Sequence, residues 1–467
     1  MTEVNWPLPK LFQSLAHQLQ PDELSIDPAV LGSHGGDKWF AHHPPDIVAL
    51  PRSATAVSRI LAFASRHGVP VTTRGAGHGY VGGCVPVQGG IVLSVARMNR
   101  IREISSSDFV AVIEPGVITA DLQQEVEKVG LYYPPDPASR ADCSLGGNIA
   151  TNAGGPRCLK YGVTRDYVLG LQVALADGSL VRLGGRCHKN KTGFDLHRLF
   201  VGSEGLLGVV TEATLKLLPL PPFRACLSIG LASMAQAARV IRGVFAAGFL
   251  PSALEVADAF TLAAARRRTG SAQLEGCQAH LLIEIDGQEE SARREIVDLQ
   301  HTVEQSAPVV FVQSALGRDA CEAFWKLRRE FSYALRDTGL TKLNEDVVVP
   351  RGRLEELFQF AADLQQRHGL QLACFGHAGD GNIHVNVMLD TSDPAQAARS
   401  EACLNDLFQG ILAMDGAITG EHGVGLAKKP WWNLAISPEA DQLHRVVKNA
   451  LDPKGILNPG KFLGQLE

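Results

Sequence analysis

The chain has 467 residues, enough for two or three domains with substantial cores, and 45% of its residues are hydrophobic. A formal charge of −5 and no dense lysine and arginine run exclude the charge pattern of a nucleic-acid-binding protein. No apolar run approaches membrane-spanning length, residues 1–5 lack a signal-peptide layout, and the nine cysteines form no C-x-x-C pair. We therefore expect free thiols and a cytoplasmic location, with peripheral attachment to a membrane left open.

The first half of the chain is rich in glycine and in short apolar runs bounded by glycine or proline, which predicts strands. Apolar residues at helical spacing predict a helix over residues 54–67. The predicted strands are 47–50, 69–73, 90–95, 110–114, 170–176 and 208–218. Residues 219–222 are rich in proline and predict a linker.

Beyond the linker, predicted strands alternate with amphipathic helices, which favours an α+β domain with a sheet covered on one face. The predicted helices are 234–247, 289–304, 318–336 and 354–368. The predicted strands are 279–286, 308–313, 347–349, 372–377 and 382–389. In the last of these, apolar residues alternate with His384 and Asn386, so we expect a half-buried strand with both side chains on one face. The turn-rich tail, residues 451–461, is expected to pack on the first half.

Three glycine-rich motifs in the first half, residues 74–83, 134–155 and 202–211, can hold a large ligand through backbone groups. In the first, closely spaced glycines expose consecutive N–H groups that can cradle a pyrophosphate. Its spacing is not G-x-G-x-x-G, so a Rossmann NAD site fits poorly. Any one motif is also compatible with turns on a β-rich scaffold, but three together favour a large cofactor.

Two clusters nearer the C-terminal end, residues 376–386 and 420–423, carry histidines and a carboxylate among glycines. They offer two imidazoles and a carboxylate to a divalent metal such as zinc, with another histidine beside the carboxylate. Three protein ligands leave coordination positions open, as in catalytic sites. The alternative is a polar hairpin with hydrogen-bonded histidines.

Over nearly its whole length the chain resembles the FAD-linked 2-hydroxy acid dehydrogenases of the vanillyl-alcohol-oxidase type. These include D-lactate dehydrogenases, the flavin subunit of glycolate oxidase and D-2-hydroxyglutarate dehydrogenase. The resemblance rests on the motifs and on their order, namely residues 74–83, 134–155, 161–166, 193–211, 376–386, 420–423 and 451–461.

The resemblance implies an α+β protein with a two-part FAD-binding domain of the PCMH type. That domain is expected over residues 1–221, with its core at about 42–221, and the segment 424–467 is expected to return to it. Residues 222–423 are expected to form an α+β capping substrate domain that has an antiparallel sheet and carries the metal site.

The resemblance also implies roles for individual residues. A divalent metal, zinc or alternatively manganese or iron, would be held by His377, His384 and Glu421, with His422 as catalytic base. The substrate-binding residues would be Arg328, Ser332, Lys342 and Asn386, although a solvated charged helix face is the alternative for Arg328. The residues expected to hold FAD are Arg74, Gly75, Ala76, Gly77, His78, Gly79, Gly82, Pro135, Asp136, Ser139, Gly146, Gly147, Asn148, Ala150, Thr151, Asn152, Gly154, Gly155, Gly205, Val209, Val210 and Asn458.

Two positions depart from the family pattern, since His78 and Leu206 stand where these relatives usually carry threonine. The sequence around His78 is close to that of a histidine that binds flavin covalently in the berberine-bridge branch of the superfamily. A covalent bond from His78 to FAD is therefore one hypothesis, and a pyrophosphate or isoalloxazine contact is the other. Leu206 suggests a hydrogen bond lost near the cofactor.

The expected reaction is oxidation of a D-2-hydroxy acid, D-lactate first, to the 2-oxo acid, with hydride transfer to flavin. Electrons would pass to a quinone, a cytochrome, an electron-transfer flavoprotein or an iron–sulfur subunit. An oxygen-dependent flavoprotein oxidase of another alcohol and a non-catalytic flavin or metal sensor are the other classes considered. Glycolate and D-2-hydroxyglutarate stay open as substrates, as does a homodimer as the assembly.

Overall fold

The structure is a computed structural model that describes residues 8–463, and the chain forms two compact units. Unit 1 contains Met1–Ala153, Val163–Pro219 and Glu421–Glu467, and unit 2 contains Gly154–Gly162 and Leu220–Gly420. The expectation drawn from the first five residues of the chain lies outside the described part.

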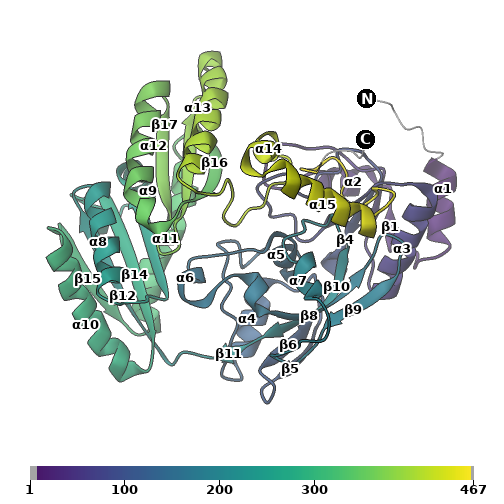
Figure 1. Cartoon of the computed structure of the whole chain (residues 1–467), viewed down its shortest axis with the longest axis horizontal. Helices are drawn as coiled ribbons and strands as arrows, with labels where there is room; N and C mark the ends of the chain where they lie inside the picture. Colours follow the sequence, from purple (N-terminus) through teal and green to yellow (C-terminus); the bar gives the residue numbers. More distant parts are fainter. Residues whose placement is uncertain (1–7, 464–467) are drawn as a thin grey trace. The chain divides into compact units, whose positions relative to one another are not determined.

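Unit 1 contains two main sheets and a short two-stranded pair among its described residues (Figure 1). The mixed sheet, in spatial order, has β1 (Leu24–Ser25), β2 (Ile47–Ala49), β4 (Ile91–Ser94) and β3 (Val71–Arg74). The antiparallel sheet, in spatial order, has β5 (Ile101–Ser105), β6 (Val110–Ile113), β10 (Val209–Lys216), β8 (Val168–Ala174) and β9 (Leu180–Gly184). The pair is β11 (Leu218–Pro219) with β7 (Leu131–Tyr132). The α-helices are α1 (Leu8–Ala16), α2 (Pro28–Ser33), α3 (Ala54–His67), α4 (Thr119–Glu127), α5 (Leu145–Thr151), α7 (Leu196–Phe200), α14 (Trp432–Ala435) and α15 (Pro438–Leu451).

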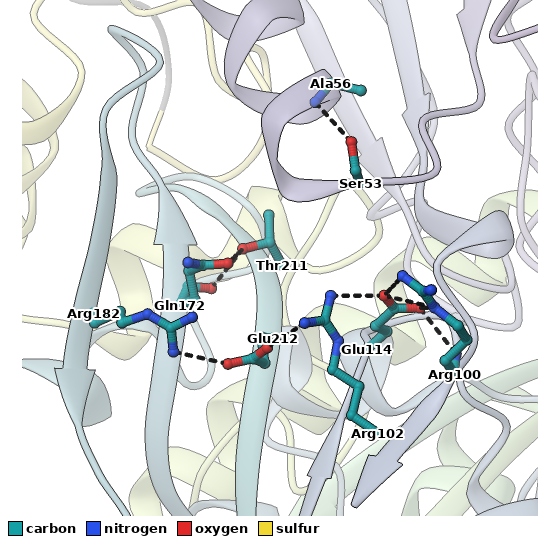
Figure 2. Close-up of polar contacts among 9 residues, drawn as sticks. All are labelled: Ser53, Ala56, Arg100, Arg102, Glu114, Gln172, Arg182, Thr211 and Glu212. Carbon is teal, nitrogen blue, oxygen red and sulfur yellow. Dashed lines mark hydrogen bonds and ion pairs between the residues drawn. The ribbon is translucent and has the colours of Figure 1, made fainter. Parts of the chain in front are cut away.

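Helix α3 occupies the residues predicted from its periodicity. Its start is fixed by Ser53, whose Oγ accepts a hydrogen bond from Ala56 N at 3.2 Å (Figure 2). Its end is fixed by Gly68, which adopts the left-handed conformation at φ 68°. The buried face includes Ile60 and Leu61, which share one core with the mixed sheet. Full burial of each such side chain stabilises the unit by about 1.5–3 kcal/mol.

A row of ion pairs crosses the antiparallel sheet of unit 1 (Figure 2). Glu114 accepts from Arg100 Nη2 at 2.8 Å and from Arg102 Nη2 at 2.9 Å. Arg102 Nη1 lies 3.0 Å from Glu212, which also binds Arg182 Nη1 at 2.9 Å. Burial would raise the pKa of Glu114, but the hydrogen bonds from the arginines lower it below its usual value. Because the arginines are exposed, solvent screens these pairs and each contributes little to the stability of the sheet.

Unit 2 is built on one seven-stranded sheet whose strand pairs are all antiparallel (Figure 1). In spatial order the strands are β15 (Phe311–Leu316), β12 (Phe223–Leu231), β14 (Ala279–Gly287), β13 (Ala253–Asp258), β17 (Gln371–His377), β18 (Asn382–Leu389) and β16 (Thr341–Val348). The α-helices are α6 (Cys158–Tyr161), α8 (Met234–Ala246), α9 (Ala259–Thr269), α10 (Glu289–Ser306), α11 (Arg318–Arg336), α12 (Leu354–His368) and α13 (Pro394–Ala413).

Helices cover both faces of this sheet, so the expectation of one covered face is wrong. On one face, Leu262 of α9 and Phe331 of α11 form a core with Phe375 of β17 and Met388 of β18. Helix α12 contacts β17, helix α13 contacts β18, and β18 is buried at every position. Successive side chains of a strand point to opposite faces, so burial at every position requires cover on both. The predicted half-buried strand is therefore a fully buried one.

The segment Gly154–Gly162 belongs to unit 2, although the sequence assigned it to the FAD-binding domain. Arg157 binds Glu284 of β14 with two hydrogen bonds of 2.9 Å, and Lys160 Nζ lies 2.5 Å from Asp286 Oδ1. Both carboxylates are buried, so these pairs hold the segment to the sheet of unit 2. Among the described helices of the whole chain, none combines the length and the apolar character that a membrane crossing requires.

Candidate active site

The first two glycine-rich motifs meet at the N-terminus of α5. Ser144 Oγ accepts hydrogen bonds from Ala76 N at 3.2 Å and from Gly147 N at 3.3 Å. A Cβ atom on Gly75 would lie 2.5 Å from Ser144 Oγ, so glycine is required for this close approach. The loop after β3 is thereby held against the start of the second motif.

The third motif packs along the same helix. Gly202 N donates to Ile149 O at 2.9 Å, and Glu204 N donates to Ala150 O at 2.8 Å. The first and third motifs, which more than a hundred residues separate in the sequence, therefore both contact α5 of the second motif, as a shared ligand site requires.

The C-terminal tail joins this group through Asn458. Its backbone N donates to Val71 O of β3 at 2.7 Å, and its Nδ2 donates to Gly83 O at 3.0 Å and Glu204 O at 2.7 Å. Asn458 thus connects the first and third motifs.

The residues at this junction fit FAD. Thr73 Oγ1 and Asn458 Oδ1 are buried and have no hydrogen-bond partner within residues 8–463. Gly205 lies beside both, because a Cβ there would be 3.6 Å from Thr73 Cβ and 3.8 Å from Asn458 Nδ2. Buried polar atoms around a bare glycine suit a flat ring system with polar edges, such as isoalloxazine.

Arg74 supports the first motif internally. Its Nη1 donates to Gly36 O and lies 3.2 Å from Cys84 Sγ, and a Cβ on Gly77, where φ is +72°, would collide with the guanidinium. His78 is half-buried, and burial lowers its pKa, although the charge of Asp142 opposes this. Its imidazole is therefore neutral at pH 7.

Two of the expected FAD residues use their side chains within the protein. Asn148 Nδ2 donates to Thr119 Oγ1 at 2.8 Å, and Asn152 Oδ1 accepts from Arg165 N at 2.9 Å. The two glycines at 154 and 155 fall in unit 2. Contact with FAD stays a prediction for every residue expected to hold the cofactor, including Gly79, Gly82, Pro135, Asp136, Ser139, Gly146, Thr151, Val209 and Val210.

Strands β17 and β18 form a hairpin that carries both predicted histidine ligands. In its register His377 pairs with Asn382, and Phe375 pairs with His384, so the histidines are diagonal neighbours on one face. Their ring centroids are 5.7 Å apart with an angle of 78° between the planes. The tight turn depends on Gly381, whose φ is +88°.

Glu421 completes the predicted ligand group. The boundary of unit 2 falls at the Gly420–Glu421 peptide bond, and Gly420 N is held by Asp346 Oδ2 at 2.9 Å. His377, His384 and Glu421 each offer one ligand atom, and these atoms all lie within 4.8 Å of one another. Two imidazole nitrogens and one carboxylate oxygen suit zinc and also accommodate manganese or iron.

Glu255 of β13 contacts His377, one of the two predicted histidine ligands. Its Oε1 lies 2.7 Å from His377 Nδ1, and its Oε2 accepts from Arg328 Nε at 2.7 Å and from Arg328 Nη2 at 2.5 Å. Burial would raise the pKa of Glu255, but the charge of Arg328 and the hydrogen bonds from Arg328 and His377 lower it below its usual value. Since a carboxylate only accepts hydrogen bonds, His377 Nδ1 carries the proton and a metal would bind through Nε2, which is the pattern of metal-binding histidines.

Two of the predicted substrate-binding residues, Arg328 and Lys342, lie over the ring of Phe375. The guanidinium of Arg328 lies 4.9 Å from the ring centroid, Lys342 Nζ lies 6.0 Å from it, and the His384 ring lies 5.2 Å from it. Lys342 Nζ also donates to Ser332 Oγ at 2.9 Å. The structure thus brings two cations and a hydroxyl together with one of the predicted metal ligands.

Burial lowers the pKa of Lys342 to about 7, and the nearby charge of Arg336 adds to the effect. Asn386 is fully buried, and its Nδ2 donates to Ala373 O at 2.9 Å and to His384 O at 3.1 Å. Its Oδ1 has no partner in the described part of the chain, so it is an acceptor suited to a ligand.

His422 follows Glu421 in a turn that unit 1 stabilises. Its Nε2 lies 3.8 Å from Glu421 Oε1, and its ring centroid lies 5.2 Å from that of Tyr80. The carboxylate of Glu204 accepts from Val424 N and Gly425 N, each at 2.8 Å, and so holds the chain just after the turn.

Comparison with known families decides what these motifs belong to. A model described as FAD linked oxidases, C-terminal domain, matches residues 220–462, and one described as FAD binding domain matches residues 45–184. The chain belongs to the FAD-linked oxidase family.

Relatives cover most of the chain. The glycolate oxidase subunit GlcD of Bacillus subtilis (strain 168) is 39% identical over 90% of this chain and 89% of its own. The D-lactate dehydrogenase of Anaerostipes hadrus is 34% identical over 90% of each, and the D-2-hydroxyglutarate dehydrogenase of Stutzerimonas stutzeri (strain A1501) is 32% identical over 97% and 99%. The protein is an FAD-dependent oxidoreductase of the 2-hydroxy acid dehydrogenase family, as the resemblance implied.

The solved structures agree on the fold. A crystal structure of p-cresol methylhydroxylase with substrate bound superposes with a TM-score of 0.80 at 18% identity, over 98% of this chain and 97% of the other. The predicted α+β fold of the vanillyl-alcohol-oxidase type, with an antiparallel sheet in the capping domain, is confirmed.

Four residues of the site have no individual role among the predictions made from the sequence, namely Glu204, Glu255, Asp346 and Phe375. Glu255 had a usable signal, because it is the one charged residue in Ala-Leu-Glu-Val-Ala, an otherwise apolar stretch. An unpaired charge in such a buried strand is costly, so its presence indicates a specific partner. Glu204 stood inside the third motif, between the glycines at 202 and 205.

Proposed function

We propose that this protein oxidises a D-2-hydroxy acid, with D-lactate as the favoured substrate, to the corresponding 2-oxo acid. The observation that carries the proposal is the group formed by His377, His384 and Glu421, whose ligand atoms lie within 4.8 Å of one another. The cations Arg328 and Lys342, which share the ring of Phe375 with His384, support a carboxylate-bearing substrate.

Oxidation at C2 removes the hydroxyl proton and also the α-hydrogen with its electron pair. When bound, FAD supplies the acceptor for that hydride. His377, His384 and Glu421 would hold a divalent ion, which would supply a Lewis acid that favours loss of the hydroxyl proton. His422 is proposed to take the hydroxyl proton, because it directly follows a metal ligand in a turn that Glu204 stabilises.

The charge of the cluster favours a monocarboxylic acid. The charge of Arg328 is already balanced by Glu255. Lys342, by contrast, has no acidic side chain within hydrogen-bond distance among the described residues. A second carboxylate on the substrate would need a further cation. This argues for lactate or glycolate over 2-hydroxyglutarate.

The electrons are proposed to leave the flavin for an external acceptor, such as a quinone, a cytochrome, an electron-transfer flavoprotein or an iron–sulfur subunit. The name of the Bacillus subtilis relative describes a subunit of an oxidase, which supports a partner chain as one such acceptor.

Anaerobic mixing with D-lactate, L-lactate, glycolate and D-2-hydroxyglutarate tests the proposal. D-Lactate should bleach the flavin absorbance fastest, and both a chelator and His422→Ala should abolish the bleaching. His444→Ala, which removes an exposed imidazole from α15, is the control and should leave the bleaching intact. If no 2-hydroxy acid reduces the flavin, the proposal is wrong, and reduction by another alcohol with rapid reoxidation by oxygen would favour the oxidase alternative.

A further inference from the structure

We infer that Glu255 is a positioning residue that holds a metal ligand and the substrate's carboxylate clamp in place at once. The inference rests on the proposed function, in which His377 binds the metal and Arg328 binds the acid. One buried carboxylate, that of Glu255, thus sets the orientation of both His377 and Arg328.

The backbone brings Glu255 to this place. Glu255 of β13 pairs with His377 of β17 in the antiparallel register, so their side chains lie on the same face of the sheet. Arg328 reaches the same carboxylate from α11, which packs on that face. The Glu255 side chain is 1% exposed, so water does not compete for its oxygens.

Each carboxylate oxygen of Glu255 binds one of the two partners. Oε1 lies 2.7 Å from His377 Nδ1, which fixes the tautomer and the ring plane and directs Nε2 away from the carboxylate. Oε2 accepts from both Nε and Nη2 of Arg328 and so fixes the plane of the guanidinium over Phe375.

A buried ion pair alone is weak evidence for a functional role, because such pairs also occur for structural reasons. The neighbouring strand supplies a comparison. Glu284 of β14 is also fully buried and also binds an arginine, Arg157, with two hydrogen bonds of 2.9 Å, but its other hydrogen-bond donors are Trp325, Ser252 and Cys226. A purely structural role predicts the same consequences for loss of either carboxylate.

The test compares Glu255→Gln with Glu284→Gln in the full-length flavoprotein. A glutamine keeps one acceptor and presents an NH₂ group to the other partner, so either His377 or Arg328 loses its acceptor. We expect Glu255→Gln to weaken zinc binding, measured by competition with a chromophoric chelator, by about 10–100-fold, and to change the visible spectrum of bound Co²⁺. Glu284→Gln should keep the zinc affinity within about threefold of the wild type, even where urea unfolding shows a similar loss of stability.

The wild-type protein offers a measurement that does not depend on the folding of a variant. Histidine-selective ¹⁵N NMR of the zinc-loaded protein, assigned with His377→Ala, should show the His377 proton on Nδ1. The inference is overturned if the His377 proton lies on Nε2 or if the wild-type protein binds no divalent ion. It is also overturned if Glu255→Gln keeps the wild-type zinc affinity, or if Glu284→Gln loses as much zinc affinity as Glu255→Gln. The proposed reaction is judged separately by flavin bleaching, so zinc results that support Glu255 can stand while the substrate assignment fails.

Discussion

Asp346 offers a sharp test of how the predicted ligand Glu421 is held. Asp346 is fully buried in β16, and its Oδ2 accepts from Gly420 N at 2.9 Å and from Thr419 Oγ1 at 3.0 Å. Its Oδ1 accepts from Asn382 Nδ2 at 2.6 Å. Asp346→Asn keeps the shape of the side chain and replaces one acceptor oxygen with an NH₂ group.

In either orientation of the new amide, its NH₂ group faces a donor whose hydrogen bond the carboxylate had accepted. Hydrogen bonds to a charged group each contribute about 1.5–3 kcal/mol, so the loss of one or two of them should destabilise unit 2 by about 3 kcal/mol. If about 1.4–2.8 kcal/mol of this falls on the placement of Glu421, zinc binding weakens about 10–100-fold.

Urea unfolding and chelator competition for zinc measure the two effects. Asp258→Asn is the matched control, because both oxygens of Asp258 also accept hydrogen bonds, from Thr261 N at 2.9 Å and from Cys374 N at 2.7 Å. It should lose similar stability and keep its zinc affinity. Equal zinc affinity in Asp346→Asn and wild type would refute the reasoning, and an equal loss in both variants would show that the effect is one of general stability.

Three further predictions concern the substrate lysine and the cofactor. Lys342 carries its charge below its pKa of about 7 and loses it above, so kcat/KM for the acid should fall as pH rises through 7. Lys342→Arg, which stays charged, should extend the plateau to higher pH, and the same fall in that variant would assign the titration elsewhere. Asn458→Leu removes the hydrogen bonds to Gly83 O and Glu204 O, so its FAD affinity, measured by flavin fluorescence, should drop about tenfold or more, whereas Asn449→Leu on the exposed side of α15 should not change it. Acid precipitation should release all the flavin to the supernatant if His78 only contacts FAD, and we expect this result; flavin retained in the pellet of the wild type but not of His78→Ala would show a covalent bond.

Local chemistry made several elements predictable from the sequence. Helices α3, α11 and α12 have the predicted bounds, because an apolar face recurs at helical spacing in each, and left-handed glycines end α3 and α12. Strand β18 also has its predicted bounds.

Other elements left no such local signal. Strands β12 and β13 are almost entirely buried and so lack the alternation that marks a half-exposed strand. In β16 the predicted segment covered only the end, because the polar residues of Thr341–Val348 are matched by partners on β18 and α11 that lie far away in the chain.

For the site, the sequence by itself determined which chemical groups are present. The motifs specified the kinds of groups, backbone cradles for FAD and two histidines with a carboxylate for a metal, because glycine spacing and residue type are local properties. The family resemblance assigned roles to them.

Only the tertiary structure decided which groups support those residues. Glu255 lies 122 positions from His377 and 73 positions from Arg328 in the chain. The pairing of β13 with β17 and the packing of α11 on the sheet bring the three together. Strand order in an antiparallel sheet depends on long-range burial, which no local pattern encodes. The contacts of Glu255 with His377 and Arg328 therefore form only in the folded chain.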